Sequence, residues 1–238
     1  MPLPVHNTRH LRPPPSQPLL PRNSLPTQPD DSLPRLLFTA RRAFCRKEFW
    51  SEVVALDRLR YKNTNQHRGS LHFRKLLEVK RLLKRLEENA PDAVIDELLD
   101  LMHPQRTKKL TGPWTFVPQQ PQLCYCLGRL IGCYALLDQL TKSTTTAYTY
   151  FQSMTSQTLF MAFGLTTMSS LARLHFLTEK MMTELALCYD VLWKLKHVLP
   201  VSKEGMPSYA EDLPADLNLE YLRRVLGGME SNRVLADS

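Results

Sequence analysis

A long segment without proline constrains the fold of this chain of 238 residues more than any other feature. No proline lies between Pro121 and Pro200, and leucines recur through the segment with the period of a helix. One helix of that length exceeds what a globular domain normally uses, so we expect two long helices. Residues 153–156 predict the break, with the second helix beginning at Gln157, and residues 164–167 are the alternative.

The second of these helices carries the clearest apolar period, with spacings that alternate between three and four. Such a seam packs against another helix, and a short turn makes the preceding helix its antiparallel neighbour in an all-α bundle. The seam consists of Leu174, Leu177, Met181, Leu185, Cys188, Leu192, Leu195 and Leu199. The expected facing residues are Leu127, Leu130, Tyr134, Leu137, Tyr148 and Phe151.

An earlier helix is predicted over residues 33–60. Ser32 is a suitable cap, Pro34 fits the first helical turn, and apolar residues follow at spacings of three and four. Polar turn formers over residues 62–70 interrupt this period and predict a connection between two helices.

The helical period resumes after this connection. Residues 71–86 predict an amphipathic helix, with apolar residues on one face and Arg74, Arg81 and Arg85 on another. A short third helix is predicted around residues 94–102, and residues 104–119 form a loop bounded by prolines. Strand patterns and internal repeats are not expected.

Three parts follow along the chain. Residues 1–34 contain ten prolines, so residues 1–32 are predicted to form a disordered, partly polyproline arm. Residues 33–200 form the helical bundle domain, and residues 201–238 a turn-rich segment with one short helix around 217–226. The predicted fold is therefore all-α, a bundle of about five helices that includes two long antiparallel ones.

Composition excludes several classes of protein. With 43% hydrophobic and 23% charged residues, the chain is expected to fold over most of its length. Residues 1–20 hold prolines in place of an apolar signal segment, and no stretch of about 18 apolar residues is free of polar runs, so neither secretion nor membrane spanning is expected. Five cysteines, an odd number, are typical of reduced thiols in the cytosol or nucleus.

The strongest functional signal is the charge between residues 58 and 85. Ten cationic residues lie there with one acidic residue, Glu78, in a chain whose net charge is +8. Cations gathered on one turn and one helix face repel one another, and a phosphate backbone removes that repulsion. The alternative is a basic solvent face without a partner. The ten are Arg58, Arg60, Lys62, Arg68, Arg74, Lys75, Lys80, Arg81, Lys84 and Arg85.

Polar and aromatic side chains in the same span favour structured RNA as the ligand. The amides and imidazole of residues 63–67 can bond bases, 2′-hydroxyls or phosphates, while Tyr61, His72 and Phe73 offer stacking surfaces. Taken singly, the polar residues can instead cap helices. The predicted RNA-binding residues are Lys62, Asn63, Asn65, Gln66, His67, Arg68, Arg74, Lys75, Arg81 and Arg85.

Motifs for catalysis and for metal binding are missing from the sequence. There is no G-x-S-x-G, P-loop, G-x-G-x-x-G or H-E-x-x-H, so we expect neither an enzyme nor a cofactor. Cys124 and Cys126 point about 200° apart on a helix, and with Cys133 they lack a fourth ligand, so we expect core thiols and no metal. The Met-rich residues 154–182 predict packed core, with an exposed docking groove as the alternative.

Two runs of sequence resemble a known family. Lys-Asn-x-Asn-Gln-His-Arg at residues 62–68 precedes Phe73 and the run Leu-Leu-x-x-Lys-Arg-Leu-Leu-Lys-Arg-Leu at residues 76–86. This pattern is similar to the nucleolus and neural progenitor protein (Nepro) family and to the small protein subunit specific to RNase MRP in fungi. The similarity continues through residues 117–121, residues 130–137, the leucine-rich helix and a Pro-x-x-Leu-x-x-Glu stretch that ends at Glu220, and it covers roughly residues 35–222.

The resemblance implies a non-catalytic protein of the nucleus and nucleolus, associated with RNase MRP and pre-ribosomal RNA processing, with a role in progenitor cells. Its implied partners are structured RNA of the MRP or pre-ribosomal type and ribonucleoprotein subunits, with no membrane and no small-molecule substrate. RNA contact is then expected at Asn63, Asn65, Gln66, His67 and Arg68. Family members generally continue into a long basic region, so a chain that ends at Ser238 is expected to be a short isoform or incomplete. The competing hypothesis is a helical protein-interaction scaffold that does not bind RNA directly.

Overall fold

Helices make up nearly all the regular structure of the computed structural model, which describes residues 11–15, 18–25, 32–102, 114–200, 205–215 and 217. The predicted all-α class is confirmed. The elements in chain order are β1 (Leu20–Pro21), the 3-10 helix η2 (Arg22–Ser24), α1 (Leu33–Phe44), α2 (Lys47–His67), α3 (Leu71–Asn89), α4 (Pro91–Met102), β2 (Phe116–Val117), α5 (Gln120–Ser156) and α6 (Met161–Val198).

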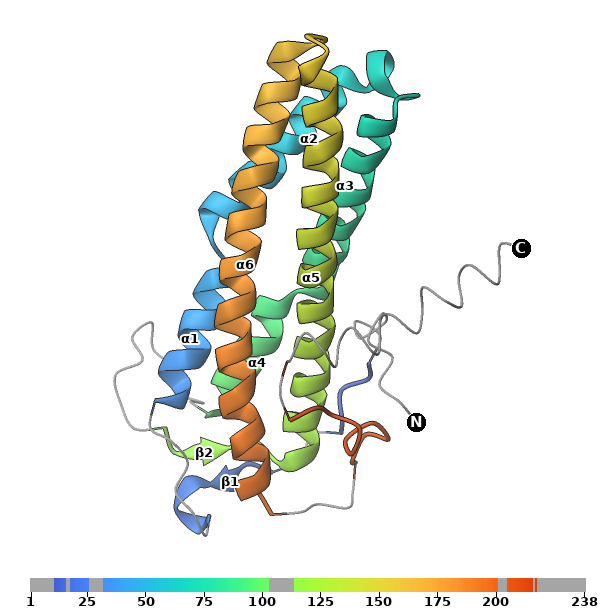
Figure 1. The fold of residues 1–238 in the computed structure, drawn as a ribbon. Helices are drawn as coiled ribbons and strands as arrows, with labels where there is room; N and C mark the ends of the chain where they lie inside the picture. Colours follow the sequence, from blue (N-terminus) through green and yellow to red (C-terminus); the bar gives the residue numbers. More distant parts are fainter. Residues whose placement is uncertain are drawn as a thin grey trace, which may run out of the picture.

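The two long helices predicted from the proline-free segment are α5 and α6, and they form an antiparallel hairpin along the whole molecule (Figure 1). The turn between them, residues 157–160, directly follows the predicted break, although α6 begins at Met161. The alternative break at 164–167 is wrong, because these residues are helical. Gly164 instead lets the helices approach, since a Cβ there would collide with the side chain of Thr155.

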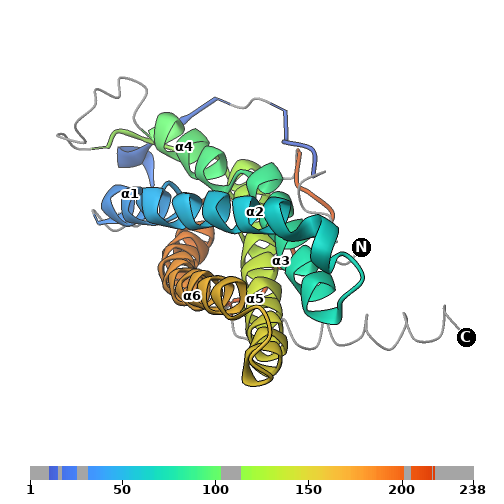
Figure 2. The same ribbon diagram turned by 90° about the horizontal axis from the view of Figure 1, so that it is seen from above.

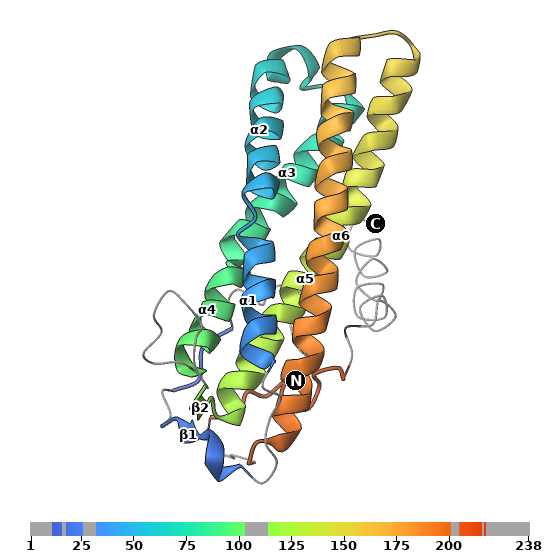
Figure 3. The same ribbon diagram turned by 90° about the vertical axis from the view of Figure 1, so that its left-hand side faces the viewer.

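The four shorter helices pack end to end along this hairpin. α1 leads into α2 and α3 into α4, so the chain forms a four-helix bundle in up-down-up-down order (Figure 3). We call the part where α1 and α4 pack on the hairpin the lower half, and the part where α2 and α3 pack on it the upper half. Seen along the bundle, α1 and α2 lie over α6, while α3 lies beside α5 (Figure 2).

The single helix predicted over residues 33–60 is wrong, because the backbone breaks at Cys45 and Arg46. Arg46 leaves the helical conformation, with φ −59° and ψ 116°. The indole N–H of Trp50 donates to the carbonyl of Phe44 at 2.8 Å, which satisfies one of the carbonyls left free where α1 ends. Neither proline nor glycine lies at the break, so the local sequence does not predict it.

The connection predicted over residues 62–70 is mostly helix, because α2 continues to His67 and the turn comprises residues 68–70. Asn63 donates its side-chain N–H to the carbonyl of Leu59, and Thr64 its hydroxyl to that of Arg60, each at 2.8 Å. His67 is buried against α6, as described below. Tertiary packing therefore extends the helix through residues whose own preference is for turns.

A second break separates α3 from α4 at Ala90, whose φ of 42° is left-handed. The guanidinium of Arg129 on α5 donates to the carbonyl of Asn89 at 2.6 Å, so it caps the end of α3 from a neighbouring helix. The buried amide of Asn89 donates to the thiol of Cys133 at 3.1 Å. The predicted short third helix is confirmed as α4, which begins at Pro91.

The core follows the predicted seam. All eight seam residues are buried, and so are the facing residues apart from the half-buried Tyr148. Cys124, Cys126 and Cys133 are buried, as the core-thiol interpretation predicts. Burial raises the pKa of Cys133 to about 12, so this thiol stays protonated as an apolar core group.

A short two-stranded sheet and a cation–π contact lie at the lower end of the bundle. β1 pairs antiparallel with β2, with Leu20 opposite Val117, so the expectation of no strand is wrong at this point. The guanidinium of Arg22 lies 4.4 Å from the ring centroid of the buried Trp114. Parts of the predicted proline-rich arm therefore lie against the bundle, whereas residues 1–10, 16–17 and 26–31 lie outside the described residues.

The described part of the C-terminal segment packs on α6. The hydroxyl of Tyr189 donates to the carbonyl of Pro214 at 2.7 Å, and the ammonium of Lys196 to that of Ala210 at 2.8 Å. The helix predicted around residues 217–226 lies outside the described residues except for the buried Leu217.

One described helix, α5, is long and apolar enough to span a membrane, although the sequence predicted no such segment. In the bundle, however, 83% of its most apolar window is buried. Packing against α3 and α6 accounts for this composition, as for the core helix of a bundle.

Candidate nucleic-acid interface

The predicted RNA-binding residues all lie in the upper half, on the antiparallel pair α2 and α3 and their turn (Figure 1). Most of them are exposed, namely Lys62, Asn65, Gln66, Arg68, Arg74, Arg81 and Arg85. Asn63 and Lys75 are half-buried, and His67 is buried. The structure therefore brings the cationic members together on the surface and separates the histidine from them.

The arginines of α3 share the exposed face of that helix. At 100° per residue Arg74, Arg81 and Arg85 fall within about 40° of one another, along about 16 Å of helix. The opposite face holds the apolar residues of the predicted amphipathic pattern, which are buried against α5. Burial of one face thus fixes the arginines in a row toward solvent, where they suit the repeating charges of a phosphate backbone.

Some of the cations in this span are neutralised within the protein. Asp57 of α2 accepts from Lys80 of α3 at 2.6 Å and from Arg60 at 2.9 Å, and these hydrogen bonds, that of Lys80 foremost, lower the pKa of its carboxyl group. Lys75 pairs with Glu78 at 3.0 Å. Asp57 precedes the span from which the charge excess was counted, so its role was missed.

Of the other exposed cations in this span, Lys84 pairs with Glu88 at 3.8 Å. The remaining six have no ion-pair partner among the described residues. They are Arg58, Lys62, Arg68, Arg74, Arg81 and Arg85. Their guanidinium and ammonium groups are available to phosphates, because no carboxylate among the described residues has to be displaced first, and Arg74 donates only to the carbonyl of Gly69 at 3.4 Å. These six side chains define the surface that we call the basic face.

His67 joins the two turns at the upper end of the bundle. Only 3% of its surface is exposed, and its ring stacks on Phe163 of α6 with the centroids 4.9 Å apart. The ring of Phe160 meets it edge-on at 4.5 Å. Its Nδ1 lies 3.2 Å from Nε2 of His72 on α3. The histidine of the Asn-x-Asn-Gln-His-Arg element therefore connects α2 and α3 to the α5–α6 hairpin.

Hydrogen bonding assigns the protons of the two histidines. The hydroxyl of Ser70 donates to the carbonyl of His67 at 2.7 Å, so its oxygen accepts from Nε2–H of His72 at 3.0 Å. The same N–H points at Nδ1 of His67, which leaves the proton of His67 on Nε2, where it has no acceptor among the described residues. Desolvation lowers the pKa of both rings, and His67 lowers that of His72 further.

These positions revise the list of contact residues. The ring of His67 is inside the protein, so we leave it out of the basic face. Phe73 is buried as well and offers no stacking surface, which corrects that prediction. Tyr61, in contrast, is 77% exposed on α2 beside the basic face, as a stacking residue needs to be.

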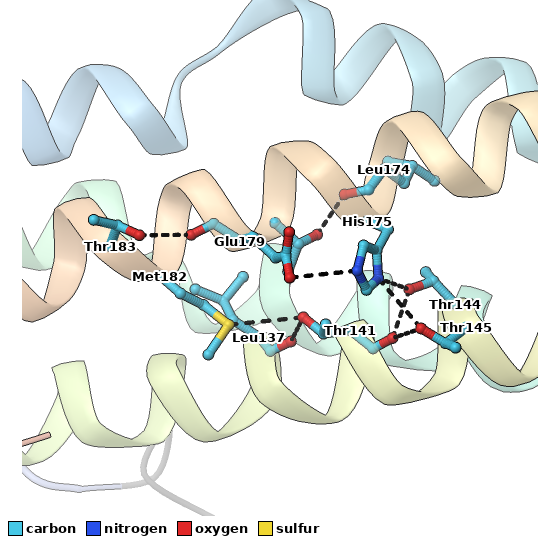
Figure 4. A network of polar contacts seen from close by, with 10 residues as sticks. Leu137, Thr141, Thr144, Thr145, Leu174, His175, Glu179, Met182 and Thr183 are labelled. Carbon is cyan, nitrogen blue, oxygen red and sulfur yellow. Dashed lines mark hydrogen bonds and ion pairs between the residues drawn. The ribbon is translucent and has the colours of Figure 1, made fainter. Parts of the chain in front are cut away.

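A second polar network joins α5 to α6 further along the hairpin (Figure 4). Nδ1 of His175 lies 3.3 Å from the hydroxyl of Thr144, and its Nε2 lies 3.4 Å from Glu179. The Thr144 hydroxyl already donates to the carbonyl of Thr141, so His175 has to donate through Nδ1 and cannot act as its base. In the described part of the chain, no three His, Cys, Asp or Glu side chains gather in a way that suits a metal ion.

Residues 6–193 match the family described as "Nucleolus and neural progenitor protein, N-terminal". The chain belongs to this family. Membership implies a nucleolar protein, and the match includes the basic face and all but the last five residues of the helical hairpin. It begins at residue 6, whereas the resemblance seen in the sequence began near residue 35, so the family region includes most of the proline-rich arm. No curated protein and no solved structure matches the chain.

Proposed function

We propose that this protein is a non-catalytic nucleolar accessory protein that binds RNA through the basic face, within a ribonucleoprotein. The observation that carries this proposal is the set of six exposed cations, on two packed helices and the turn between them, that have no ion-pair partner within the described part of the chain. If five of them contact phosphates, the logarithm of the binding constant falls with the logarithm of salt concentration with a slope of about −4.

The chemistry around the cations favours RNA over other polyanions. The exposed amides of Asn65 and Gln66 stand next to Arg68 at the turn, and Tyr61 offers an exposed ring. Amides bond base edges and 2′-hydroxyls, and aromatic rings stack on unpaired bases. Phosphate contacts from the arginines of α3 then position a structured RNA while the turn contacts a loop or bulge.

The RNA we propose is that of RNase MRP or a pre-ribosomal RNA, with a consequent role in progenitor cell differentiation. Support comes from the similarity of residues 62–68 and 76–86 to the fungal RNase MRP subunit and from the nucleolar family. In this role the bundle is a rigid scaffold, and catalysis in the particle belongs to the RNA.

Crosslinking in cells, followed by sequencing of the recovered RNA, tests this proposal. The variant Arg68→Glu/Arg74→Glu/Arg81→Glu reverses three charges of the basic face, all on exposed side chains. The matched control Arg35→Glu/Arg42→Glu/Lys180→Glu changes the net charge equally at exposed positions of α1 and α6. The proposal predicts enrichment of MRP or pre-ribosomal RNA with the wild type and the control, and its loss with the basic-face variant.

Two results would count against the proposal. Background recovery of RNA with all three proteins contradicts direct binding and leaves a protein-interaction scaffold as the function. Equal losses in both variants show a dependence on net charge alone, without a role for the basic face. Circular dichroism of the purified variants establishes beforehand that each retains the helical fold.

A further inference from the structure

Four apolar side chains are exposed together at the upper end of the bundle. Leu159, Phe160, Met161 and Leu165 belong to the α5–α6 turn and the first turns of α6, and between 43% and 52% of each is exposed. We call them the apolar tip. Single exposed apolar residues are ordinary, whereas a cluster of this kind marks an interaction surface.

The turn that carries the apolar tip is held firmly. Phe160 has a left-handed backbone with φ 48°, and its ring lies nearly perpendicular to that of the buried His67 with the ring centroids 4.5 Å apart. Gly164 lies directly against the side chain of Thr155, which fixes the start of α6 on the end of α5. A surface that is ordered before binding loses little conformational entropy when a partner arrives.

Charge around the apolar tip is of one sign. No Asp or Glu lies between Asp57 and Glu78, or between Asp138 and Glu179, and these two segments form the upper end of the bundle. Exposed Lys62 and Arg68 belong to the neighbouring end of α2 and its turn, which His67 joins to the tip. A partner that covers the tip therefore meets cations at its rim, and carboxylates on that partner complement them.

The kind of apolar group distinguishes a protein partner from RNA. Three of the four side chains are aliphatic or thioether groups, which do not stack on bases as aromatic rings do. Aliphatic and thioether groups instead suit the apolar core of a protein interface, where methionine is enriched and adapts to differently shaped partners. The rim of cations matches the acidic flanks of an amphipathic helix, whose apolar side chains recur every three or four residues.

We infer that the apolar tip is a docking site for an acidic amphipathic helix of a protein partner, next to the basic face, with which it shares Lys62 and Arg68 at its rim. One protein can then hold an RNA along α2 and α3 and a protein subunit at the end of the bundle.

Selection from a peptide library tests this inference with the full chain. Random peptides of about 16 residues, enough for four helical turns, are displayed on phage and selected on the immobilised protein. We expect the enriched sequences to combine apolar residues at spacings of three and four with flanking Asp or Glu. A synthetic peptide of the consensus is then measured against two variants.

The tip variant is Leu159→Ser/Met161→Gln/Leu165→Ser, which leaves Phe160 in its contact with His67. The matched control is Val54→Ser/Phe176→Ser/Leu187→Ser, three apolar side chains that are 50%, 63% and 55% exposed outside the tip. The tip variant is expected to bind the peptide about tenfold more weakly, as for loss of interface anchors, and the control to bind it as the wild type does. Replacement of the peptide's carboxylates by amides is also expected to weaken binding.

Several outcomes would overturn the inference. One is a selection that yields no peptides, or peptides without the acidic amphipathic pattern. Another is equal affinity of the tip variant and the wild type for the consensus peptide. Binding of oligouridine, binding of vesicles that contain phosphatidylserine, and self-association by sedimentation are also measured for the wild type and both variants. A loss confined to one of these would assign the tip to single-stranded RNA, a lipid surface or a second copy of the chain instead.

Discussion

The two halves of the bundle share the α5–α6 hairpin but differ in how their charges are used. In the lower half, Asp96 of α4 pairs with Arg41 of α1 at 2.7 Å, and Glu97 accepts from Gln122 of α5 at 2.6 Å. In the upper half, the acidic Asp57 faces Lys80 and Arg60, while the cations of the basic face have no ion-pair partner in the ranges that the structure describes.

This difference separates polar groups that hold the bundle together from those available to a ligand. α4 carries four acidic residues and no basic one, so it supplies partners to the helices around it. α3 carries an excess of basic residues on the face turned away from the core. Unpaired like charges cost stability through repulsion, and a polyanionic ligand removes that cost. Carboxylates of the lower half thus make contacts between helices, whereas the upper half carries the exposed cations of the basic face.

The largest expected change in stability comes from a cavity made in the lower half, which tests whether the two halves are independent. Leu98 of α4 is fully buried, and Leu98→Ala is expected to reduce the free energy of unfolding by about 2–5 kcal/mol. RNA affinity of the folded variant should stay that of the wild type, because the basic face lies in the other half. Urea denaturation and RNA binding at low temperature measure the two quantities. A large loss of affinity in the folded variant would show that the halves are not independent.

A smaller loss of stability is expected from an added methyl group at the tip. In Gly164→Ala the new Cβ collides with Thr155, and overpacking of this kind costs about 1–3 kcal/mol. Thr155→Ala in the same chain makes room for the methyl group and should restore part of the loss. Thermal unfolding of the single and double variants measures it, and additive losses would contradict the close approach of the two helices.

Acidification should loosen the upper end selectively. The folded-state pKa of His67 and His72 is lowered below its ordinary value of 6.5, so the unfolded chain binds more protons at acidic pH and stability falls as the pH falls below about 6.5. The protection factors of the amides across residues 64–72, which are corrected for the slower intrinsic exchange at lower pH, should fall between pH 7.5 and pH 5.5 as the upper end opens. His72→Gln keeps an N–H donor without that titration and should reduce this loss of protection, whereas His197→Gln on α6 should not.

The smallest expected effect concerns Asp57, whose carboxylate links α2 to α3. Asp57→Asn removes a partly exposed pair with Lys80 and should change stability by about 1 kcal/mol or less. The same change frees Lys80 and Arg60, so RNA affinity should rise by about twofold to fivefold. A filter-binding titration at low salt is the measurement, and weaker binding would place Asp57 among the contacts to RNA.

Much of the fold could be predicted because its signals are local and repeated. The absence of proline and the leucine seam define α5 and α6, and proline and polar residues mark the ends of α4. The break between α1 and α2 could not be predicted from the sequence, since it depends on the hydrogen bond from Trp50 to Phe44 and on packing with α6. The extension of α2 to His67 likewise depends on burial against Phe163, far away in the sequence.

The basic face was partly visible in the sequence because charge excess can be counted along the chain. Helical spacing also places Arg74, Arg81 and Arg85 on one face. The sequence alone does not show which cations are paired, so Lys75 was included although it binds Glu78. Nor does it show that His67 is buried, since a histidine in a polar run has no local signal of burial. The apolar tip lies within the Met-rich residues 154–182, for which an exposed docking groove was the alternative to packed core.

The salt dependence of RNA binding tests the central claim, that the basic face of the upper half contacts phosphates, most directly. Binding of a hairpin RNA is measured at several salt concentrations for the wild type, for Arg74→Glu/Arg81→Glu, and for Arg35→Glu/Arg42→Glu, which has the same spacing on α1. The account predicts a slope of about −4 for the wild type, reduced in magnitude by about 2 in the first variant and unchanged in the second. A slope near zero, or the same reduction in both variants, would contradict it.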